Sequence, residues 1–365
     1  MPDAATVGRD VVFRIASRDT RLASVRYRAL MPACALQDNR YTTALCSDAS
    51  PSNAQPRVAI GVKPLRASDA AWVSRMRARG VPTVVDLCDN IFVDGYGGQG
   101  SAIADSFRDS VRGGLVTVPT TALRDVVRDN TDVAAERVMI VPDIVENARL
   151  LHRQMRLLGA RPLSTARLPG WGQVGAWAGR GMRALGMRGP VLIWFGNHGA
   201  SHGSFGLDDL RLWEDALREA SLLGAQLWVV SNHRQRFEAM QGALPIRTRY
   251  FEWSPSRVDT LLAFADVCLV PNSMDAFSRS KSPNRALKSL AAGVPVVATA
   301  TPAMQELEGA AWLGDPAAGI RAYLDDPGLR DAHLAAARQR MQQDFSMDTL
   351  RQAMSAVMRE ALAHG

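Results

Sequence analysis

One strand, helix, strand segment in the last third of the chain limits the possible folds more than any other feature. Its flanking runs, VCLVP (Val267–Pro271) and VPVVAT (Val294–Thr299), are apolar throughout and rich in β-branched residues. Strands buried on both faces of a parallel sheet have this composition. Between them, Ser282 suits an N-cap, Pro283 the first helical position, and Gly293 the left-handed residue that ends a helix. The segment therefore predicts a parallel α/β sheet.

The loop and first helical turn of this segment predict an anion site. Helix N-termini present backbone N–H groups and the positive end of the helix dipole. Lys281, Asn284 and Arg285 lie beside this N-terminus. Because ligands of open α/β sheets bind at the carboxyl ends of strands, we expect a phosphate or diphosphate here. The alternative is a solvated basic turn without a ligand.

The same alternation of strands and helices extends over most of the chain. Before residue 147, strands are expected at Val11–Ser17, Val58–Lys63, Thr83–Asp89, 114–120 and Val138–Glu146. After residue 190, they are expected at Val191–Gly196, Ala225–Asn232, Arg247–Trp253 and the two runs above. This alternation is typical of parallel, doubly wound sheets. We predict domains at 1–146 and 191–345, a basic linker or insertion at 147–190, and a closing helix at 346–365 that packs back on the first domain.

The composition is that of a globular protein with room for two cores. The chain has 365 residues, of which 47% are hydrophobic and 22% charged. Its first ten residues lack the pattern of a signal peptide, and no apolar run is long enough to span a membrane. We therefore expect a cytoplasmic protein. Four scattered cysteines predict reduced thiols, with no disulfide and no structural metal: Cys34, Cys46, Cys88 and Cys268.

The net charge of +7 is unevenly distributed and favours an acidic partner such as nucleic acid, anionic lipid or a phosphorylated ligand. No Asp or Glu occurs between Asn147 and Leu207, whereas arginines are frequent there and Trp171 and Trp177 lie among them. Arginine interleaved with Leu, Met and Trp is typical of interfacial helices. We predict that 147–190 docks on the inner face of the cytoplasmic membrane. The alternative is a linker packed on its own domain.

Several motifs, in their order along the chain, resemble those of glycosyltransferases with the GT-B fold. The run FADVCLVPNSMDAFSRSKSPNRALKSLAAGVPVVAT is similar to the donor-binding segment of glycosyltransferase family 4 and its bacterial relatives. KSxNR together with WFGNHG (Trp194–Gly199) resembles a group of bacterial enzymes associated with surface polysaccharide. SVRYRALMPA, GVKPL, VDLCDN and VPDIVE are similar to amino-terminal motifs of these proteins. The resemblance covers nearly the whole chain except 147–190.

The resemblance implies two Rossmann-like doubly wound domains that face each other across a cleft. It also implies transfer of a sugar from a nucleotide diphosphate sugar to a saccharide or lipid-linked acceptor, in the synthesis of a bacterial surface polysaccharide such as lipopolysaccharide. No cofactor and no metal are expected, and a retaining outcome is favoured over an inverting one. One departure concerns the family's E-x7-E pattern, because Ser280 and Lys288 stand at its two Glu positions. The carboxylate that holds the ribose is therefore missing or replaced.

The predicted donor site combines residues that follow strands of the second domain: Gly196, Asn197, His198, Gly199, Asn232, Glu252, Trp253, Ser280, Lys281, Ser282, Asn284 and Arg285. The basic loop and helix start would bind the diphosphate. The glycine-flanked turn would let a ligand approach the backbone, and His198 would contact the sugar or phosphate. Trp253 would stack on the base, and Glu252 would replace the missing ribose ligand. The alternatives are a turn histidine bonded to backbone and a core tryptophan.

Five charged residues at strand ends of the first domain are expected on the acceptor side: Arg26, Arg28, Lys63, Asp86 and Asp89. A general base must be a carboxylate or imidazole within hydrogen-bond reach of the acceptor hydroxyl. Asp89 is the candidate in an inverting enzyme. A retaining enzyme needs no such base, because the leaving diphosphate can accept the proton. The alternative is that Asp86 or Asp89 caps a loop.

Three other functions are compatible with the sequence. A GT-B phosphorylase or epimerase is one, and a phosphorylase would need one of only three lysines, Lys63, Lys281 or Lys288, for pyridoxal phosphate. A basic protein that binds membrane or nucleic acid is another, although no helix-turn-helix, RNP or zinc-finger signature is present, so specific nucleic-acid binding is not expected. A GT-B protein that binds sugar nucleotides without catalysis is the third.

Overall fold

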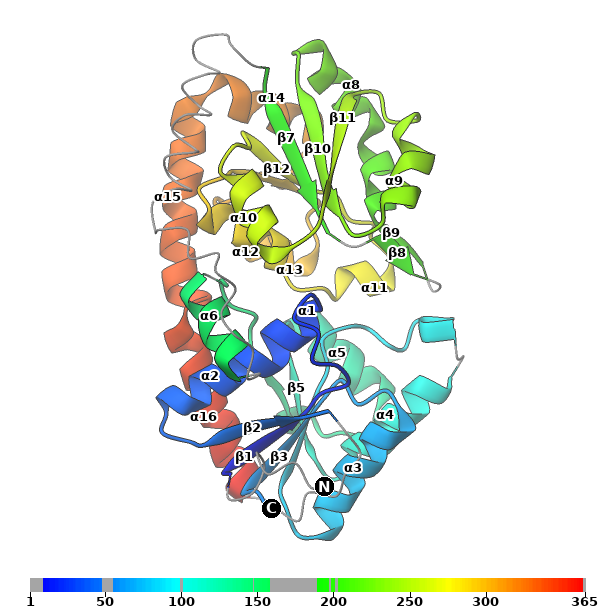
Figure 1. Cartoon of the computed structure of the whole chain (residues 1–365), viewed down its shortest axis with the longest axis vertical. Coiled ribbons are helices and arrows are strands. Elements are labelled where there is room, and N and C mark those ends of the chain that lie inside the picture. Colours follow the sequence, from blue (N-terminus) through cyan, green and yellow to red (C-terminus); the bar gives the residue numbers. More distant parts are fainter. Residues whose placement is uncertain are drawn as a thin grey trace. The chain divides into compact units, whose positions relative to one another are not determined.

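The computed structural model describes residues 9–47, 55–98, 101–146, 148–157, 189–196, 198–200 and 203–363. The chain divides into two compact units. Unit 1 contains Met1–Leu163, Ser280–Ser282 and Phe345–Gly365, and unit 2 contains Ser164–Arg279 and Pro283–Asp344. Each unit is built on a parallel sheet of its own (Figure 1).

The sheet of unit 1 has six strands, and all of its pairs are parallel. They are β1 (Val11–Arg14), β2 (Thr43–Cys46), β3 (Val58–Val62), β4 (Thr83–Asp86), β5 (Leu115–Val118) and β6 (Val138–Ile140). Across the sheet the order is β2, β1, β3, β4, β5, β6. Every residue of β1 to β5 is buried, because helices cover both faces.

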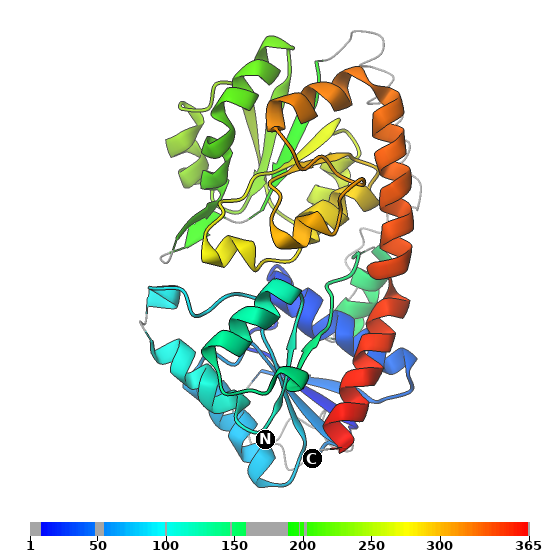
Figure 2. The same ribbon diagram turned by 180° about the vertical axis from the view of Figure 1, so that it is seen from behind.

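The helices of unit 1 lie in two layers. They are α1 (Ala23–Val25), the π-helix η2 (Arg26–Leu30), α2 (Met31–Asp38), α3 (Ala67–Ala78), η3 (Tyr96–Gly98), α4 (Ala102–Val111), α5 (Thr121–Asn130), η4 (Ala135–Arg137), α6 (Ala148–Leu157) and α16 (Met347–Ala363). Helices α2 and α16 contact each other on one face of the sheet, and α3 and α4 contact each other on the other (Figures 1 and 2). One core joins α2 and α16 to the strands, so the carboxyl-terminal helix is part of unit 1.

The main sheet of unit 2 has five parallel strands. They are β7 (Val191–Phe195), β10 (Gln226–Ser231), β11 (Arg247–Glu252), β12 (Val267–Val270) and β13 (Val296–Ala298). Their order across the sheet is β11, β10, β7, β12, β13. A separate antiparallel hairpin, β8 (His198–Ala200) and β9 (Gly203–Gly206), follows β7.

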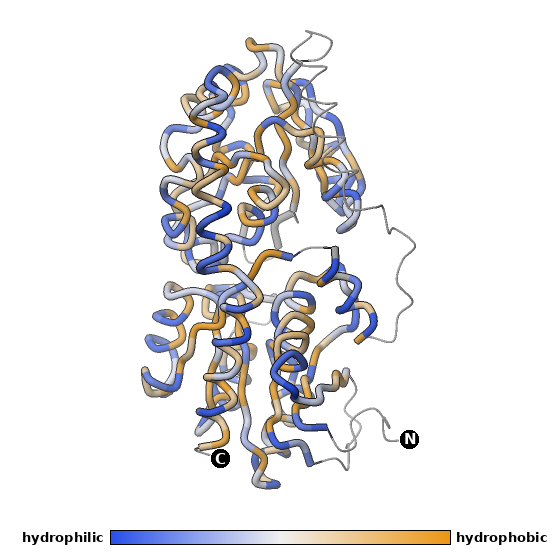
Figure 3. Tube along the Cα trace, turned by 90° about the vertical axis from the view of Figure 1, so that its left-hand side faces the viewer, coloured by the Kyte–Doolittle hydropathy of each residue, from blue (hydrophilic) through white to orange (hydrophobic). Residues whose placement is uncertain are grey.

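The helices of unit 2 connect these strands and surround a second core. They are η5 (Leu207–Trp213), α8 (Glu214–Leu222), α9 (Arg234–Gln241), α10 (Pro255–Leu262), α11 (Ala276–Arg279), α12 (Asn284–Ala291), α13 (Pro302–Gln305), α14 (Pro316–Asp325) and α15 (Pro327–Asp344). Helices α8 and α14 pack together over the core, whereas α12 packs against β12, β13 and α15. Figure 3 shows apolar residues along the strands of each unit and polar residues on the outer helices.

Both sheets reverse their strand order at one point. In unit 1 the strands that follow along the chain are added on one side of the β1–β3 pair and then on the other. In unit 2 the same happens around the β7–β12 pair. Helices on opposite faces diverge at such a point and leave a crevice beyond the carboxyl ends of the two strands, where open α/β sheets bind ligands. In unit 2 the residues just after β7 and β12 are therefore the first to inspect.

The predicted fold class, two doubly wound parallel α/β units, is confirmed. One local prediction was wrong, because helix α12 begins at Asn284 rather than Pro283, and Pro283 rather than Ser282 is its N-cap. Strand β2 was not predicted, because its TALC sequence is too short to show a period.

Helix α6 is the described start of the segment predicted to dock on a membrane. Leu150 and Leu157 pack against the core of unit 1, and Arg153 forms a 2.5 Å ion pair with Asp38 at the end of α2. This helix is therefore anchored on its own unit. The remainder, 158–188, lies outside the described residues. Across the residues that the structure covers, no helix combines the length and apolar composition needed to cross a bilayer.

The packing of α14 gives a stability prediction. A Cβ at Gly319 would lie 2.4 Å from Cδ1 of Trp312, whereas one at Gly242 would meet nothing within 4 Å. Overpacking a core costs about 1–3 kcal/mol. We expect Gly319→Ala to lower the free energy of unfolding by that amount in urea titrations, and Gly242→Ala to change it little. Equal stability of the two variants would contradict this packing.

Candidate functional site

Arg285 lies at the β7–β12 reversal of unit 2. It occupies the first turn of α12, and its Nη2 donates a 2.9 Å hydrogen bond to Oδ1 of Asn272, two residues beyond β12. Its guanidinium carbon is 5.9 Å from the ring centroid of Trp194 in β7. A guanidinium, a helix N-terminus and two strand ends thus meet at one place, which is the arrangement expected of an anion site.

The Arg285 guanidinium retains hydrogen-bonding capacity. Its Nη1 is buried and has no hydrogen-bond partner among the described residues. Burial lowers the pKa of Arg285, and the nearby negative charge of Asp209 partly opposes that shift. An arginine stays protonated despite such a shift, so Nη1 is a charged donor whose desolvation is not offset by any described residue. A bound anion would satisfy it.

Gly196 follows the last residue of β7, beside this arginine. A Cβ at this position would lie 3.2 Å from Cζ2 of Trp194 and 3.6 Å from Cδ of Arg285. Its N–H donates to the carbonyl of Val230 in β10, which fixes the strand end. A residue without a side chain therefore lets the Trp194 ring and the Arg285 side chain pack closely against the backbone here.

The other three predicted members of this turn are not described in full. Asn197 lies outside the described residues, and the side chains of His198 and Gly199 do as well, although His198 begins β8. A sugar or phosphate contact by His198 stays a prediction.

Ser280, Lys281 and Ser282 group with unit 1 rather than with Arg285. The carbonyl of Ser280 accepts a hydrogen bond from Thr120, and Ser282 donates a 2.6 Å hydrogen bond to Asp143. Asn284 and Arg285 belong to unit 2. The predicted cationic loop is therefore divided between units, and the geometry of the anion site is carried by α12 and the strand ends.

The predicted base and ribose residues surround the ends of β10 and β11. The carbonyl of Ser231 accepts hydrogen bonds from the hydroxyl of Tyr250 and from the N–H of Trp253. Tyr250 also lies 3.2 Å from Oε2 of Glu252, and burial together with that carboxylate raises the pKa of Tyr250 to about 12. Glu252 is exposed, Trp253 is half-buried, and Asn232 is exposed just after β10.

Lys288 stands where the resembling family has its second Glu. Its Nζ forms a 2.6 Å ion pair with Asp259 of α10. This lysine therefore ties α12 to α10, and no carboxylate extends from its position toward a ribose.

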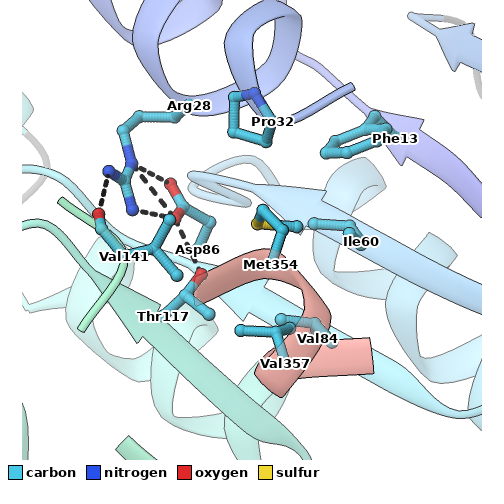
Figure 4. Close-up of a pocket in the computed structure, with 10 residues that line it drawn as sticks. All are labelled: Phe13, Arg28, Pro32, Ile60, Val84, Asp86, Thr117, Val141, Met354 and Val357. Carbon is cyan, nitrogen blue, oxygen red and sulfur yellow. Dashed lines mark hydrogen bonds and ion pairs between the residues drawn. The ribbon is translucent and has the colours of Figure 1, made fainter. Parts of the chain in front are cut away.

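In unit 1, Arg28 and Asp86 form the centre of a buried polar network (Figure 4). Arg28 is 2% and Asp86 3% exposed. Nη2 of Arg28 is 2.6 Å from Asp86, Nη1 is 2.8 Å from Asp143, and Thr117 donates to Asp86 at 2.8 Å. Burial disfavours the charge of Arg28, but the two carboxylates outweigh it and the pKa of Arg28 is raised. The adjoining cavity of about 10 Å³ can hold at most one water.

Two further ion pairs lie near this network. Arg26 pairs with Glu146 at 3.1 Å and is buried like Arg28, and both arginines belong to the π-helix. Lys63 has the unusual positive φ of 49° and pairs with Asp89. Burial opposes the charge of Lys63, but Asp89 outweighs it and raises the pKa of Lys63 well above its usual value.

The five acceptor-side residues thus lie in unit 1 as two groups with different exposure. Arg26, Arg28 and Asp86 are buried and bonded, so they hold the ends of the strands together. Lys63 and Asp89 are half-buried. Of the five, these two are the ones that a ligand could reach. A direct role in acceptor binding stays a prediction.

The groups around Arg285 were not among the predicted site residues. Asn272 lies two residues beyond β12, and Asp209 lies in η5, where its carboxylate accepts hydrogen bonds from the N–H groups of Gly206 and Ser273. Asn272 could have been found from its place after a buried strand. Asp209 could not, because its neighbourhood depends on a loop that returns to the sheet edge. In the part of the chain that is described, no three His, Cys, Asp or Glu side chains gather as metal ligands would.

Comparison with solved structures places the fold among glycosyltransferases. WaaG, a glycosyltransferase involved in lipopolysaccharide biosynthesis, has a TM-score of 0.63 and 15% identity over 95% of this chain and 99% of its own. HepE from Anabaena in complex with UDP-glucose has a TM-score of 0.67 and 13% identity, covering 96% and 100%. A glycosyltransferase from Rickettsia africae has a TM-score of 0.65 and 11% identity, covering 97% and 99%. The fold of this chain is therefore the GT-B fold of such enzymes.

Comparison of the sequence gives no closer relation. No protein-family model matches the chain. No curated protein matches it either.

The Arg28 network gives a second stability prediction. Arg28→Met would leave Asp86 and Asp143 buried beside an uncharged side chain. Breaking a buried pair in this way costs about 3–5 kcal/mol. We therefore expect unit 1 of the Arg28→Met variant to unfold at a lower urea concentration than unit 1 of the wild type. The control is Arg112→Met, at an exposed pair with Asp109, which should change the free energy of unfolding by less than about 0.5 kcal/mol. A similar loss of stability in both variants would contradict a structural role for the Arg28 network.

Proposed function

We propose that the protein is a glycosyltransferase that uses a nucleotide diphosphate sugar as donor. The observation that carries this proposal is Arg285, a guanidinium with an unsatisfied buried Nη1 beside a helix N-terminus at the strand reversal of unit 2. The GT-B fold supports it, since HepE has this fold and was solved with UDP-glucose. The donor diphosphate would lie against Arg285 and the first turn of α12.

The chemistry at this point suits departure of a diphosphate. Negative charge grows on the leaving oxygen as the sugar bond breaks, and a fixed guanidinium with helix N–H groups stabilises it without reorganising. These groups supply the charge that a metal supplies in other transferases, so we propose a metal-independent reaction that needs no cofactor. Gly196 lets the Arg285 side chain and the Trp194 ring pack against the end of β7, which helps to hold the guanidinium there.

The ribose would be held differently from the E-x7-E pattern. Lys288 is occupied by Asp259, whereas Glu252 is an exposed carboxylate at the end of β11, next to Trp253. A carboxylate can accept hydrogen bonds from both ribose hydroxyls. We assign Glu252 to the ribose and Trp253 to the base, with Asn232 at the rim of the same pocket.

A retaining outcome is favoured over an inverting one. An inverting enzyme needs a free base near the acceptor hydroxyl, and its candidate, Asp89, is paired with Lys63. A carboxylate held by an ammonium is a weaker proton acceptor. In a retaining reaction the departing diphosphate takes the proton, and the half-buried Lys63–Asp89 pair would bind acceptor hydroxyls. We propose a saccharide or lipid-linked acceptor of a bacterial surface polysaccharide.

A peripheral membrane role is proposed as the setting of this activity. It is supported by the arginine-rich composition of 147–190 and the lack of acidic residues there. Each basic residue near an anionic surface contributes about 1 kcal/mol. The inner face of the cytoplasmic membrane would present a lipid-linked acceptor.

Nucleotide binding tests the donor site. Melting curves with UDP, GDP, ADP, CDP and dTDP should show one nucleotide that stabilises the protein, by about 2.7 kcal/mol at a hundred times its Kd. Arg285→Ala removes charge-assisted hydrogen bonds of about 1.5–3 kcal/mol and should raise the Kd roughly ten- to hundredfold in calorimetry. Arg321→Ala, at an exposed pair with Glu219, is the control. Unchanged affinity of Arg285→Ala would remove the proposed site.

Substitution of Asp89 tests whether the reaction retains or inverts the anomeric configuration. We expect Asp89→Asn to lower kcat by less than about tenfold, since no base is required, and the anomeric configuration of the product, read by NMR, to match that of the donor. Loss of a true general base costs about 10²–10⁴ in rate. A loss of that size with an inverted product would show that Asp89 is the base.

A further inference from the structure

Arg285 is held by a neutral residue. Its acceptor is the amide oxygen of Asn272, at 2.9 Å, rather than a carboxylate. The two arginines of the π-helix in unit 1 differ, because Arg28 and Arg26 both pair with carboxylates. A guanidinium whose acceptor is an amide keeps its full net charge, whereas a paired guanidinium is neutralised locally.

The orientation of Asn272 is fixed by its surroundings. Its Nδ2 faces the carbonyl of Val270 at 3.4 Å, which leaves Oδ1 to accept from Arg285. Its backbone N–H donates to Oγ1 of Thr299, just beyond β13, at 3.0 Å. Asn272 as a whole is only 8% exposed. Asn272 is thus locked between the ends of two neighbouring strands.

A buried carboxylate anchors the same loop. Oδ1 of Asp209 accepts a hydrogen bond from the N–H of Ser273, the residue after Asn272, and Oδ2 accepts from Gly206 at 2.7 Å. Asp209 is 2% exposed, and its charge acts on Arg285 from a distance without replacing Asn272 as the acceptor. The guanidinium is therefore oriented by backbone-anchored groups that leave Nη1 unsatisfied.

We propose that Asn272 is a positioning residue for the donor diphosphate: it holds the Arg285 guanidinium so that Nη1 faces the anion with its charge uncancelled. This inference rests on the proposed function, since it assumes that Arg285 contacts the diphosphate. Asn272 itself contacts Arg285 and acts through it. The proposal predicts that substitution of Asn272 weakens binding of the phosphates and leaves binding of the nucleoside unchanged.

The test compares two ligands on four proteins. The ligands are the nucleoside diphosphate that stabilises the wild type and its parent nucleoside, and the proteins are wild type, Asn272→Ala, Arg285→Ala and the double variant. We expect Asn272→Ala to weaken diphosphate binding by about tenfold, with the nucleoside affinity changed less than twofold. The double variant should bind the diphosphate within about threefold of Arg285→Ala, because both changes remove one interaction.

The controls separate positioning from damage to the fold. Asn272→Ser, which keeps a polar side chain too short to reach Arg285, should behave like Asn272→Ala and provides a second variant if that one fails to fold. Asn130→Ala removes an asparagine that also donates to a backbone carbonyl, to Val126 in α5, and should leave both affinities unchanged. Equal losses for diphosphate and nucleoside, or additive losses in the double variant, would overturn the inference. If Arg285→Ala alone changes nothing, the proposed donor site fails instead.

Discussion

Parallel strand pairing is the constraint on which the rest of this structure depends. In a parallel sheet all strands end at one edge, so loops that are distant in the sequence meet there. In unit 2 the reversal between β7 and β12 brings Gly196, Asn272 and Arg285 together from three separate segments. In unit 1 the ends of β3 and β4 bring Lys63 next to Asp89 in the same way.

Arg285 differs in its partners from the fully buried arginines of unit 1. Arg14, Arg26 and Arg28 pair with carboxylates, and Arg28 contacts both Asp86 and Asp143. Such pairs hold strand ends in place. Because their opposite charges largely cancel, they attract a charged ligand only weakly. Unit 2 gives Arg285 an amide acceptor and an unsatisfied Nη1. A bound anion would offset the desolvation cost of that buried donor. For this reason our proposal places the donor site at Arg285 rather than at the arginine network of unit 1.

The sequence predicted the fold class well because its strands are buried on both faces and therefore show as apolar runs. The run Val191–Phe195 is an example, and all five of its residues are buried. Arg285 could be chosen as a candidate from the sequence, since a basic residue after a strand and at a helix start can be recognised from local order. Asn272 and Asp209 were missed because their importance comes from contacts across the sheet edge. The roles of Arg26, Arg28 and Asp86 could not be separated from those of Lys63, because exposure depends on how the π-helix packs.

The account depends most on where the diphosphate binds. A crystal structure of the protein with the stabilising nucleoside diphosphate would locate its phosphorus atoms directly. Our account predicts phosphate oxygens within hydrogen-bond distance of Nη1 of Arg285 and of the first-turn N–H groups of α12, with Asn272 still bonded to Nη2. A nucleotide bound in a different place, with Nη1 facing no phosphate, would contradict it.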